Sequence, residues 1–258
     1  MAESVIVACE MIEDEVRLAL RSLPPEERPP IVWVQSGLHD WPDKLHTALA
    51  DIVARLDAGA SSGQAVLVPS VRPGRGPADS RREEVRVGPV DTVLLAFGFC
   101  GRALVGLRSE RLRLVFPRVD DCVSLLLNAG CSREEVPRNP RHYYLTRGWF
   151  THESSLTQAF EDWVRRYGSE KAAKLRKTLF SGYEQVSVID TGAYRLSECL
   201  EHSCKFASEV GLRCDVVQGS VQLLEKLFRQ EEDSEIVVVP PGEEITFEHL
   251  IRVPEQAR

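Results

Sequence analysis

The sequence predicts an α/β fold, with a mainly parallel sheet flanked by helices and built from Rossmann-like units. Short runs rich in Val, Ile and Leu alternate along the chain with longer segments whose apolar residues recur at helical spacing. Several of these runs end abruptly in Cys or Asp, where a strand of an open sheet meets its ligand crevice. The 258 residues fit a single α/β domain over 1–258, and they also allow two lobes, 1–150 and 151–258.

The chain begins with two strand–helix units. Ser4–Ala8 has the pattern of a buried strand, and Met11–Leu23 shows helical spacing with acidic residues in its first turn, where the helix dipole favours them. Ile31–Val34 predicts the second strand. Pro42 is suited to the first turn of a helix, which we expect to run to about Leu56.

The segment from Asp57 to Gly88 is rich in Gly, Ser, Pro and Arg, and only Ala65–Val68 has the pattern of a short strand. We therefore interpret residues 60–88 as a flexible, exposed insertion, the alternative being a functional lid.

Beyond this insertion, strands and helices are expected to alternate to near the end of the chain. The expected strands are Asp91–Ala96, Leu112–Phe116, Arg141–Thr146, Gln185–Ile189, Cys214–Val217 and Ile236–Val239. The expected helices run from Cys122 to about Gly130 and over Ser155–Tyr167, Ser169–Phe180, Ala193–Val210 and Val221–Phe228. Residues 240–258 have the pattern of a turn followed by an edge strand.

Composition narrows the classes of function. The hydrophobic fraction of 43% and the charged fraction of 28% are those of an ordinary folded domain. A net charge of −7 argues against nucleic acid as a partner, because phosphate binding needs a basic surface. No apolar run has the length of a membrane span, and the first residues lack the order of a signal peptide. We therefore expect a cytoplasmic protein without a membrane partner.

Cysteines carry the main functional signal. Seven of them in a chain too large to need disulfide staples predict reduced thiols. Cys9, Cys100 and Cys122 each follow a strand and open a helical pattern, a place where helix dipoles stabilise a thiolate. Because the carboxyl ends of parallel strands lie side by side, we expect these three thiols to converge on one metal site. The alternative is three buried cysteines that only pack.

The other cysteines lack such a pattern. Cys199 and Cys204 flank His202, but their spacing spreads the two thiols around a helix, so no second metal site is expected. Cys131 and Cys214 have no partner pattern.

Three thiolates from three loops suit two kinds of centre. With His39 as fourth ligand they would hold Zn²⁺, and without it they would hold a [4Fe–4S] cluster whose fourth iron is open to substrate. His39 could instead act in acid–base chemistry with Asp40 orienting it, or be a surface histidine beside a capping residue. Glu10 and Asp121 flank the cysteines and are candidate general acids or bases, although an aspartate before a helix also caps it.

Further residues are candidates for binding substrate. Arg102 and Arg118 could anchor the carboxylate or phosphate of a small anionic substrate, or form surface salt bridges instead. Asp190, Thr191 and Gly192 follow a strand and could line the same crevice, the alternative being an ordinary strand-to-helix turn.

Six motifs support a resemblance to a known family: IVACE, QSGLHDWPDKL, LLAFGFCGRALVGL, LVFPRVDDCVSLLL, YYLTRGW and VIDTG. With these the chain resembles, over most of its length apart from the insertion around 60–88, an uncharacterised bacterial and archaeal family, the domain of unknown function number sixteen thirty-eight. Where that family leads us to expect His-Asp-Cys, this chain has Asp120, Asp121 and Cys122, which removes one potential ligand.

The resemblance has implications for the biological context. Members of that family are often encoded beside corrinoid-dependent methyltransferases, which implies a role in anaerobic one-carbon or methyl-group metabolism, with a corrinoid protein or methyltransferase as partner. Quinolinate synthase is a looser analogy, because it also gathers one cysteine from each of three α/β units around a cluster.

Three functions follow from these observations. The first is a metal-dependent enzyme, a transferase or lyase whose metal acts as a Lewis acid. The second is a non-catalytic carrier or chaperone that delivers a metal or corrinoid cofactor to a methyltransferase. The third is a metal-free enzyme with Cys100 as nucleophile and His39 as base.

Overall fold

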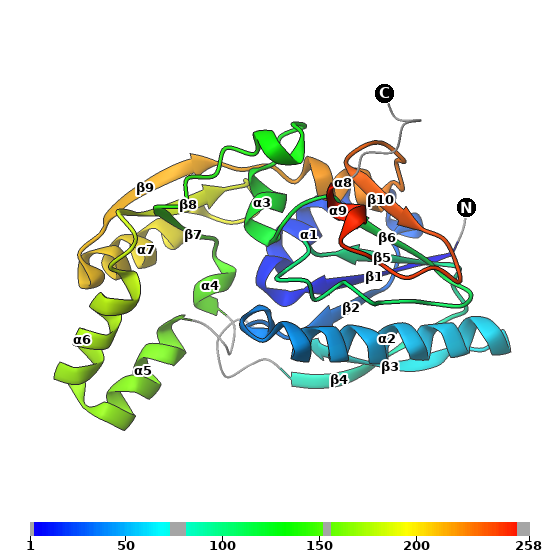
Figure 1. The fold of residues 1–258 in the computed structure, drawn as a ribbon, viewed down its shortest axis with the longest axis horizontal. Coiled ribbons are helices and arrows are strands. Elements are labelled where there is room, and N and C mark those ends of the chain that lie inside the picture. Colours follow the sequence, from blue (N-terminus) through cyan, green and yellow to red (C-terminus); the bar gives the residue numbers. More distant parts are fainter. Residues whose placement is uncertain (1–2, 73–80, 152–155, 252–258) are drawn as a thin grey trace.

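The strands of the protein form two separate sheets and a hairpin, in a computed structural model that describes residues 3–72, 81–151 and 156–251 (Figure 1). The first sheet has the strand order β10-β6-β5-β1-β2, in which β10 is antiparallel to β6 and the other neighbours are parallel. The second sheet, β7-β8-β9, is parallel throughout. The predicted α/β fold, with a mainly parallel sheet flanked by helices, is confirmed.

The first sheet and its helices are built from both ends of the chain. The strands are β1 (Ser4–Cys9), β2 (Ile31–Val34), β5 (Thr92–Ala96), β6 (Arg113–Pro117) and β10 (Ile236–Val239). The helices are α1 (Glu13–Ala19), α2 (Pro42–Ser62), α3 (Cys122–Leu127), α8 (Gln222–Phe228) and α9 (Glu248–Ile251). Strands β1 and β5 are apolar and buried on both faces, which requires helices or loops on both sides of the sheet.

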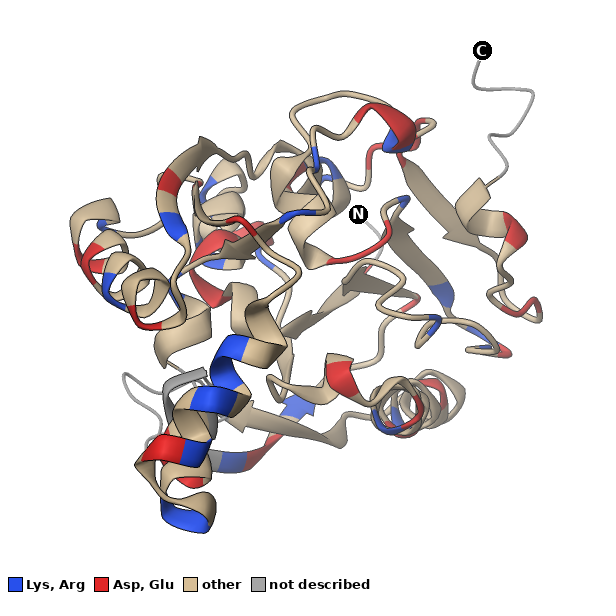
Figure 2. Cartoon of the chain, turned by 60° about the vertical axis from the view of Figure 1, so that its left-hand side comes forward, with Lys and Arg blue, Asp and Glu red and all other residues tan. Residues whose placement is uncertain are grey.

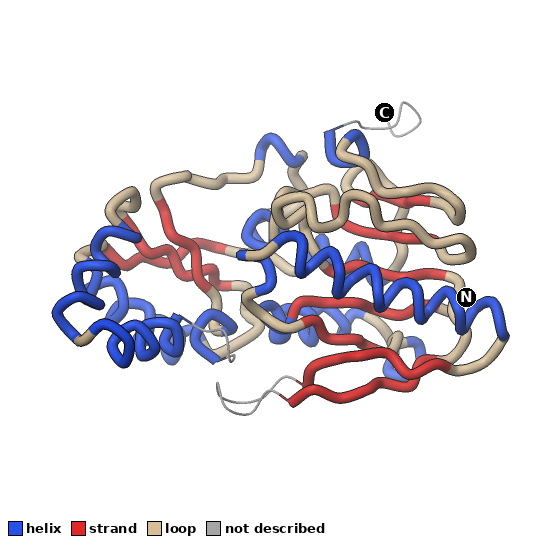
Figure 3. Tube along the Cα trace, turned by 60° about the horizontal axis from the view of Figure 1, so that its bottom comes forward, coloured by secondary structure: helices blue, strands red, loops and turns tan. Residues whose placement is uncertain are grey.

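The second sheet occupies the part of the chain between residues 142 and 218. Its strands are β7 (His142–Leu145), β8 (Gln185–Asp190) and β9 (Arg213–Gln218), with the helices α4 (Gly148–Thr151), α5 (Leu156–Tyr167), α6 (Ser169–Phe180) and α7 (Leu196–Val210). It has its own core, in which the rings of Phe160, Phe180 and Phe206 pack together. Figure 3 shows the strands of the two sheets as separate groups at opposite ends of the molecule.

We call these two parts the first lobe and the second lobe. Their boundaries along the chain differ from those of the predicted lobes, 1–150 and 151–258. Strand β7 already belongs to the second sheet, whereas α8 and β10 return to the first lobe. The pairing of β10 with β6 joins segments far apart along the chain, and no local sequence pattern predicts it.

Residues 66–87 contain more regular structure than the sequence predicted. Strands β3 (Val66–Arg72) and β4 (Arg81–Val87) form an antiparallel hairpin, and the Ser70 hydroxyl accepts a hydrogen bond from the Trp33 amide of β2 at 2.9 Å. Helix α2 continues to Ser62 and ends at Gly63, whose φ of 66° is left-handed. Alternating valines drive the hairpin, but the Gly, Pro and Arg residues around them obscured that alternation. Residues 73–80, within the predicted insertion, lie outside the described residues.

The end of the chain also differs from the expected turn and edge strand. Glu244 forms an isolated antiparallel bridge with Arg108, and α9 follows. Residues 252–258 lie outside the described residues. Charged residues gather on the helices and loops that surround the sheets (Figure 2). In the described ranges, no helix has both the length and the apolar character needed to cross a bilayer.

The carboxyl ends of the two parallel sheets face each other (Figure 1). Arg147, just after β7, forms a bidentate ion pair with Asp14 of α1, with both N–O distances at 2.6 Å. Ser220, just after β9, donates its amide to the carbonyl of Leu126 in α3 at 2.8 Å. The loops that follow the second sheet are therefore fastened to helices of the first lobe.

A buried carboxyl group lies in the same contact between the lobes. Thr191, just after β8, donates its hydroxyl to Glu15 of α1 at 3.2 Å. Burial raises the pKa of Glu15 from its ordinary 4.5 to about 8, and the nearby Asp14 carboxylate raises it further, while Thr191 and Arg147 oppose the shift only in part. Glu15 is therefore protonated in the folded protein at neutral pH.

We expect the protein to lose stability as the pH rises from about 4.5 to about 8, because the folded state holds the Glu15 proton more tightly than the unfolded state does. Glu15→Gln should remove this loss and stabilise the protein at pH 9 by up to roughly 5 kcal/mol, since the shift spans about 3.5 pKa units and one unit corresponds to about 1.4 kcal/mol. Urea unfolding of both proteins across this range measures the difference.

The exposed Glu26 offers a matched control, because Glu26→Gln should leave the pH dependence as it is. A Glu15→Gln variant whose stability falls with pH as steeply as that of the natural chain would contradict this account.

Candidate functional site

The three predicted cysteines follow three neighbouring strands of the first sheet. Cys9 is the last residue of β1, Cys100 lies in the loop after β5, and Cys122 is the first residue of α3, after β6. Strands β1, β5 and β6 are adjacent and parallel, so their carboxyl ends lie side by side. The topology therefore brings the three loops to one edge of the sheet, as the sequence predicted.

Backbone contacts join the loops after β5 and β6. The amide of Phe99 donates to the carbonyl of Val119 at 3.0 Å, and the amide of Cys100 donates to that of Asp120 at 2.9 Å. At Gly98 the two loops touch so closely that a Cβ atom would lie 2.4 Å from the Asp121 Cα. This close approach places Cys100 beside Cys122.

The backbone at Cys100 has an uncommon conformation. Three successive residues, Cys100, Gly101 and Arg102, have φ values of 44°, 65° and 76°. A left-handed conformation costs a residue other than glycine on the order of 1 kcal/mol, and such strain is found most often at functional sites. The strained turn directs the chain back after Cys100 and makes this loop a candidate for function.

The three thiols interact with one another. The contact with the Cys122 side chain is the largest cause of the raised pKa of Cys100, followed by burial and by the charge interactions with Cys122 and Cys9. Burial, followed by the proximity of Cys122, raises the pKa of Cys9. All three are free thiols. The predicted convergence of the three side chains is thus present, and the thiols of Cys9 and Cys100 are protonated at neutral pH.

A pocket of about 370 Å³ lies between the lobes, and all three cysteines line it. We call it the thiol pocket. Its opposite wall comes from the second lobe and includes Tyr143 and Trp149. Burial raises the pKa of the Tyr143 hydroxyl above its ordinary value. One wall of the thiol pocket thus carries sulfur and the other carries aromatic rings.

A close backbone contact fixes Cys9 relative to the aromatic wall. The turn Glu10–Ile12 follows Cys9 directly, and Gly148 at the start of α4 packs on the carbonyl of Met11. A Cβ atom at Gly148 would lie 1.9 Å from that oxygen, so a side chain has no room there. This packing fixes the start of α4, which carries Trp149, against the turn that follows Cys9.

Of the three predicted acid–base candidates, His39 and Asp121 line the thiol pocket and Glu10 does not. His39 lines the thiol pocket, is partly exposed, and lies 3.5 Å from the Asp40 carboxylate. Asp121 also lines it, but one of its oxygens accepts the amide of Ser124 at 2.8 Å as the cap of α3, and the other pairs with Arg138. Asp121 is thus engaged in capping and pairing, which is the alternative that the sequence left open.

Glu10 is buried outside the lining of the thiol pocket. Its carboxylate accepts the amide of Ser36 at 2.8 Å, which fastens the loop that carries His39 to the end of β1. This contact gives Glu10 a part in positioning the loop.

The predicted substrate anchors do not line the thiol pocket. Arg102 is exposed, and Arg118 is buried with its guanidinium donating to the carbonyls of Ser234, at 2.8 Å, and His249. Arg118 therefore holds the end of the chain against the first lobe. A different arginine, Arg138, lines the pocket, and no sequence motif indicated it.

The Asp190–Gly192 turn also lies outside the lining of the thiol pocket. Asp190 accepts the amide of Gly192 at 3.1 Å, and Thr191 bonds to Glu15. These contacts match the strand-to-helix turn that was the alternative interpretation.

One cysteine pair corrects the expectation that every thiol is reduced. Cys204 of α7 and Cys214 of β9 form a disulfide, with their Cα atoms 5.2 Å apart. Their pairing depends on how α7 packs against β9, and the sequence holds no signal for it. The rejection of a second metal site around Cys199, His202 and Cys204 stays a prediction.

Within the parts of the chain that the structure describes, no group of three or more His, Cys, Asp or Glu side chains has an arrangement that could hold a metal ion. The three thiols are neighbours, and those of Cys9 and Cys100 are protonated at neutral pH.

A family model described as a protein of unknown function (DUF1638) matches residues 79–228, which is more than half of the chain. The matched segment contains Cys100 and Cys122, and it begins after Cys9 and His39. The extent differs from the predicted resemblance, because the match leaves out the first two motifs and includes the end of the 60–88 segment. No curated protein and no solved structure matches the chain.

The contact at Gly98 predicts that Gly98→Ala destabilises the protein by about 1–3 kcal/mol, the usual cost of forcing an extra group into a packed site. A Cβ atom there would collide with the backbone at Asp121, which cannot move aside as a flexible side chain can. Urea unfolding measures the loss.

Gly88→Ala is the matched control, because a Cβ atom there meets nothing within 4 Å. Equal stability of the two variants would show that the loops after β5 and β6 do not depend on this contact.

Proposed function

The chain belongs to the DUF1638 family, and we propose that it binds a thiophilic metal centre, an iron–sulfur cluster or Zn²⁺, through Cys9, Cys100 and Cys122. The observation that carries the proposal is that three free thiols, from three adjacent strand ends, line one wall of one pocket. Buried cysteines that only pack have no reason to gather at the ligand edge of a parallel sheet.

The donor set fits such a centre. Thiolates are the ligands that zinc and iron–sulfur clusters prefer, and their protons are released when the metal binds. A cysteine side chain has a single χ1 torsion, and binding a shared ion would require rotamer changes that bring the three sulfur atoms around it. Three protein thiolates leave one position for a further ligand or for substrate. When bound, the centre would supply Lewis-acid chemistry.

The residues around the thiols support an enzyme. Tyr143 and Trp149 line the pocket from the second lobe, opposite the sulfur wall. His39 lines the pocket, and the Asp40 carboxylate is close enough to orient its ring. Arg138 also lines the pocket, and its guanidinium pairs with the Asp121 carboxylate. These groups would bind and orient a small organic substrate beside the thiols.

A place in anaerobic one-carbon or methyl-group metabolism is part of the proposal, and it rests on the family alone. A carrier that hands a metal or corrinoid cofactor to a methyltransferase would use the same three thiols. The metal-free alternative, with Cys100 as nucleophile, has less support, because Cys100 lies beside Cys122 and no hydrogen bond joins its thiol to a histidine among the described residues.

The proposal predicts that protein purified without oxygen and without chelators contains a stoichiometric metal. We expect about four iron and four sulfide per chain with a broad visible absorbance, or about one zinc without colour. The Cys9→Ser/Cys100→Ser/Cys122→Ser variant should reduce the bound metal to trace levels, whereas the control Cys131→Ser should retain it. Metal analysis, a sulfide assay and a visible spectrum give the answer.

Folded protein that holds no metal above trace level, or a triple variant that holds as much as the natural chain, would contradict the proposal. With metal present, turnover by the isolated protein would identify an enzyme. Stoichiometric transfer of the metal to a partner would identify a carrier.

A further inference from the structure

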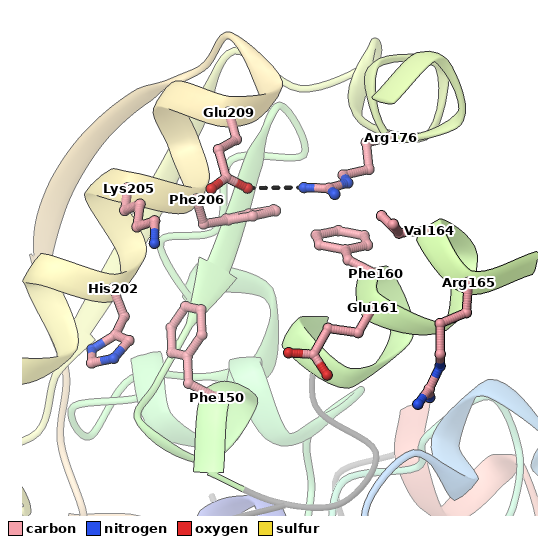
Figure 4. A pocket seen from close by; sticks show the side chains of 10 residues that line it. All are labelled: Phe150, Phe160, Glu161, Val164, Arg165, Arg176, His202, Lys205, Phe206 and Glu209. Carbon is pink, nitrogen blue, oxygen red and sulfur yellow. Dashed lines mark hydrogen bonds and ion pairs between the residues drawn. The ribbon is translucent and has the colours of Figure 1, made fainter. Parts of the chain in front are cut away.

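A second cavity, of about 530 Å³, lies in the second lobe among the helices α4, α5, α6 and α7 (Figure 4). We call it the helical cavity. Its described lining residues include none of those that line the thiol pocket. A site there would therefore act independently of the three thiols.

Aromatic rings form the apolar part of the helical cavity. Phe160 of α5 and Phe206 of α7 stack at 5.7 Å with an interplanar angle of 22°, and both are almost fully buried. Phe150 of α4 presents its ring from another side and lies 5.9 Å from the His202 ring (Figure 4). The cavity can thus enclose an apolar group between rings that come from three helices.

Two of the charged residues at the cavity neutralise each other. Arg176 of α6 pairs with Glu209 of α7 at 2.9 Å, and its guanidinium lies 4.7 Å from the centre of the Phe160 ring. Arg165 pairs with Asp162 on its own helix. Each of these two arginines is therefore neutralised by a neighbouring carboxylate.

Two other charges face the cavity without a counter-ion. Lys205 extends from α7 and Glu161 from α5, and Figure 4 shows their charged ends directed into the space beside Phe150. Neither side chain forms an ion pair or hydrogen bond with another described residue. Among its described lining residues, the helical cavity therefore combines an apolar interior with one unpaired cation, Lys205, and one unpaired anion, Glu161, on different helices.

We infer that the helical cavity binds a zwitterion with an apolar body, the class to which the aromatic amino acids belong. The ligand's carboxylate would pair with the Lys205 ammonium, its ammonium with the Glu161 carboxylate, and its apolar part would lie against Phe150 and Phe206. A simple anion would meet the unpaired Glu161 and a simple cation the unpaired Lys205. Each would leave one charge without a partner.

Calorimetric titration with L-phenylalanine and L-tryptophan tests the inference. We expect saturable binding of one ligand per chain and a loss of at least about tenfold in affinity in both Lys205→Gln and Glu161→Gln, since hydrogen bonds between charged groups contribute about 1.5–3 kcal/mol. Both side chains are exposed, so the variants should unfold at the temperature of the natural chain. Lys174→Gln, on the outer surface of α6, is the control and should bind normally.

Two analogues separate a zwitterion site from a general anion or cation site. 3-Phenylpropanoate lacks the ammonium, should bind more weakly than L-phenylalanine, and should gain affinity in Glu161→Gln. 2-Phenylethylamine lacks the carboxylate and should gain affinity in Lys205→Gln. The inference is overturned if neither amino acid binds at millimolar concentration, or if either analogue binds the natural chain as tightly as L-phenylalanine.

Discussion

The contact between the carboxyl ends of the two parallel sheets is the constraint on which the rest of the structure depends. Arg147 and Asp14 hold the lobes together through two hydrogen bonds, and the buried Glu15 lies beside them. Because each sheet turns its ligand edge toward the other, the pocket between them is enclosed by both. The first lobe supplies the sulfur atoms and the second supplies the aromatic wall, so neither lobe forms the site alone.

The sulfur wall depends on local geometry as well as on topology. Adjacent strands bring the loops close, but it is the absence of a side chain at Gly98 and the strained turn at Cys100 that put the Cys100 thiol in contact with Cys122. Thiolates crowded together in a buried site repel each other, so Cys9 and Cys100 remain protonated unless a cation replaces their protons. This is the physical basis for proposing a metal centre where the three side chains now lie beside one another.

Local patterns in the sequence predicted the parts of the structure that depend on nearby residues. The position of Cys9, Cys100 and Cys122 at strand ends and the alternation of strands and helices belong to this class. The role of Arg118, the pairing of Cys204 with Cys214 and the aromatic wall could not be predicted, because each depends on contacts between segments far apart along the chain. The β3–β4 hairpin was missed because the surrounding Gly, Pro and Arg residues outweighed a short alternation of valines.

The most direct test of the central claim, that three thiols form one site, is a titration of the reduced native protein with arsenite. Arsenous acid condenses with three thiols, forming three arsenic–sulfur bonds and releasing three molecules of water. We predict one arsenic per chain by native mass spectrometry, with Cys9, Cys100 and Cys122 protected together from alkylation while Cys131 still reacts. Protection of only two of the three, or the inclusion of Cys131 in the protected set, would contradict the account.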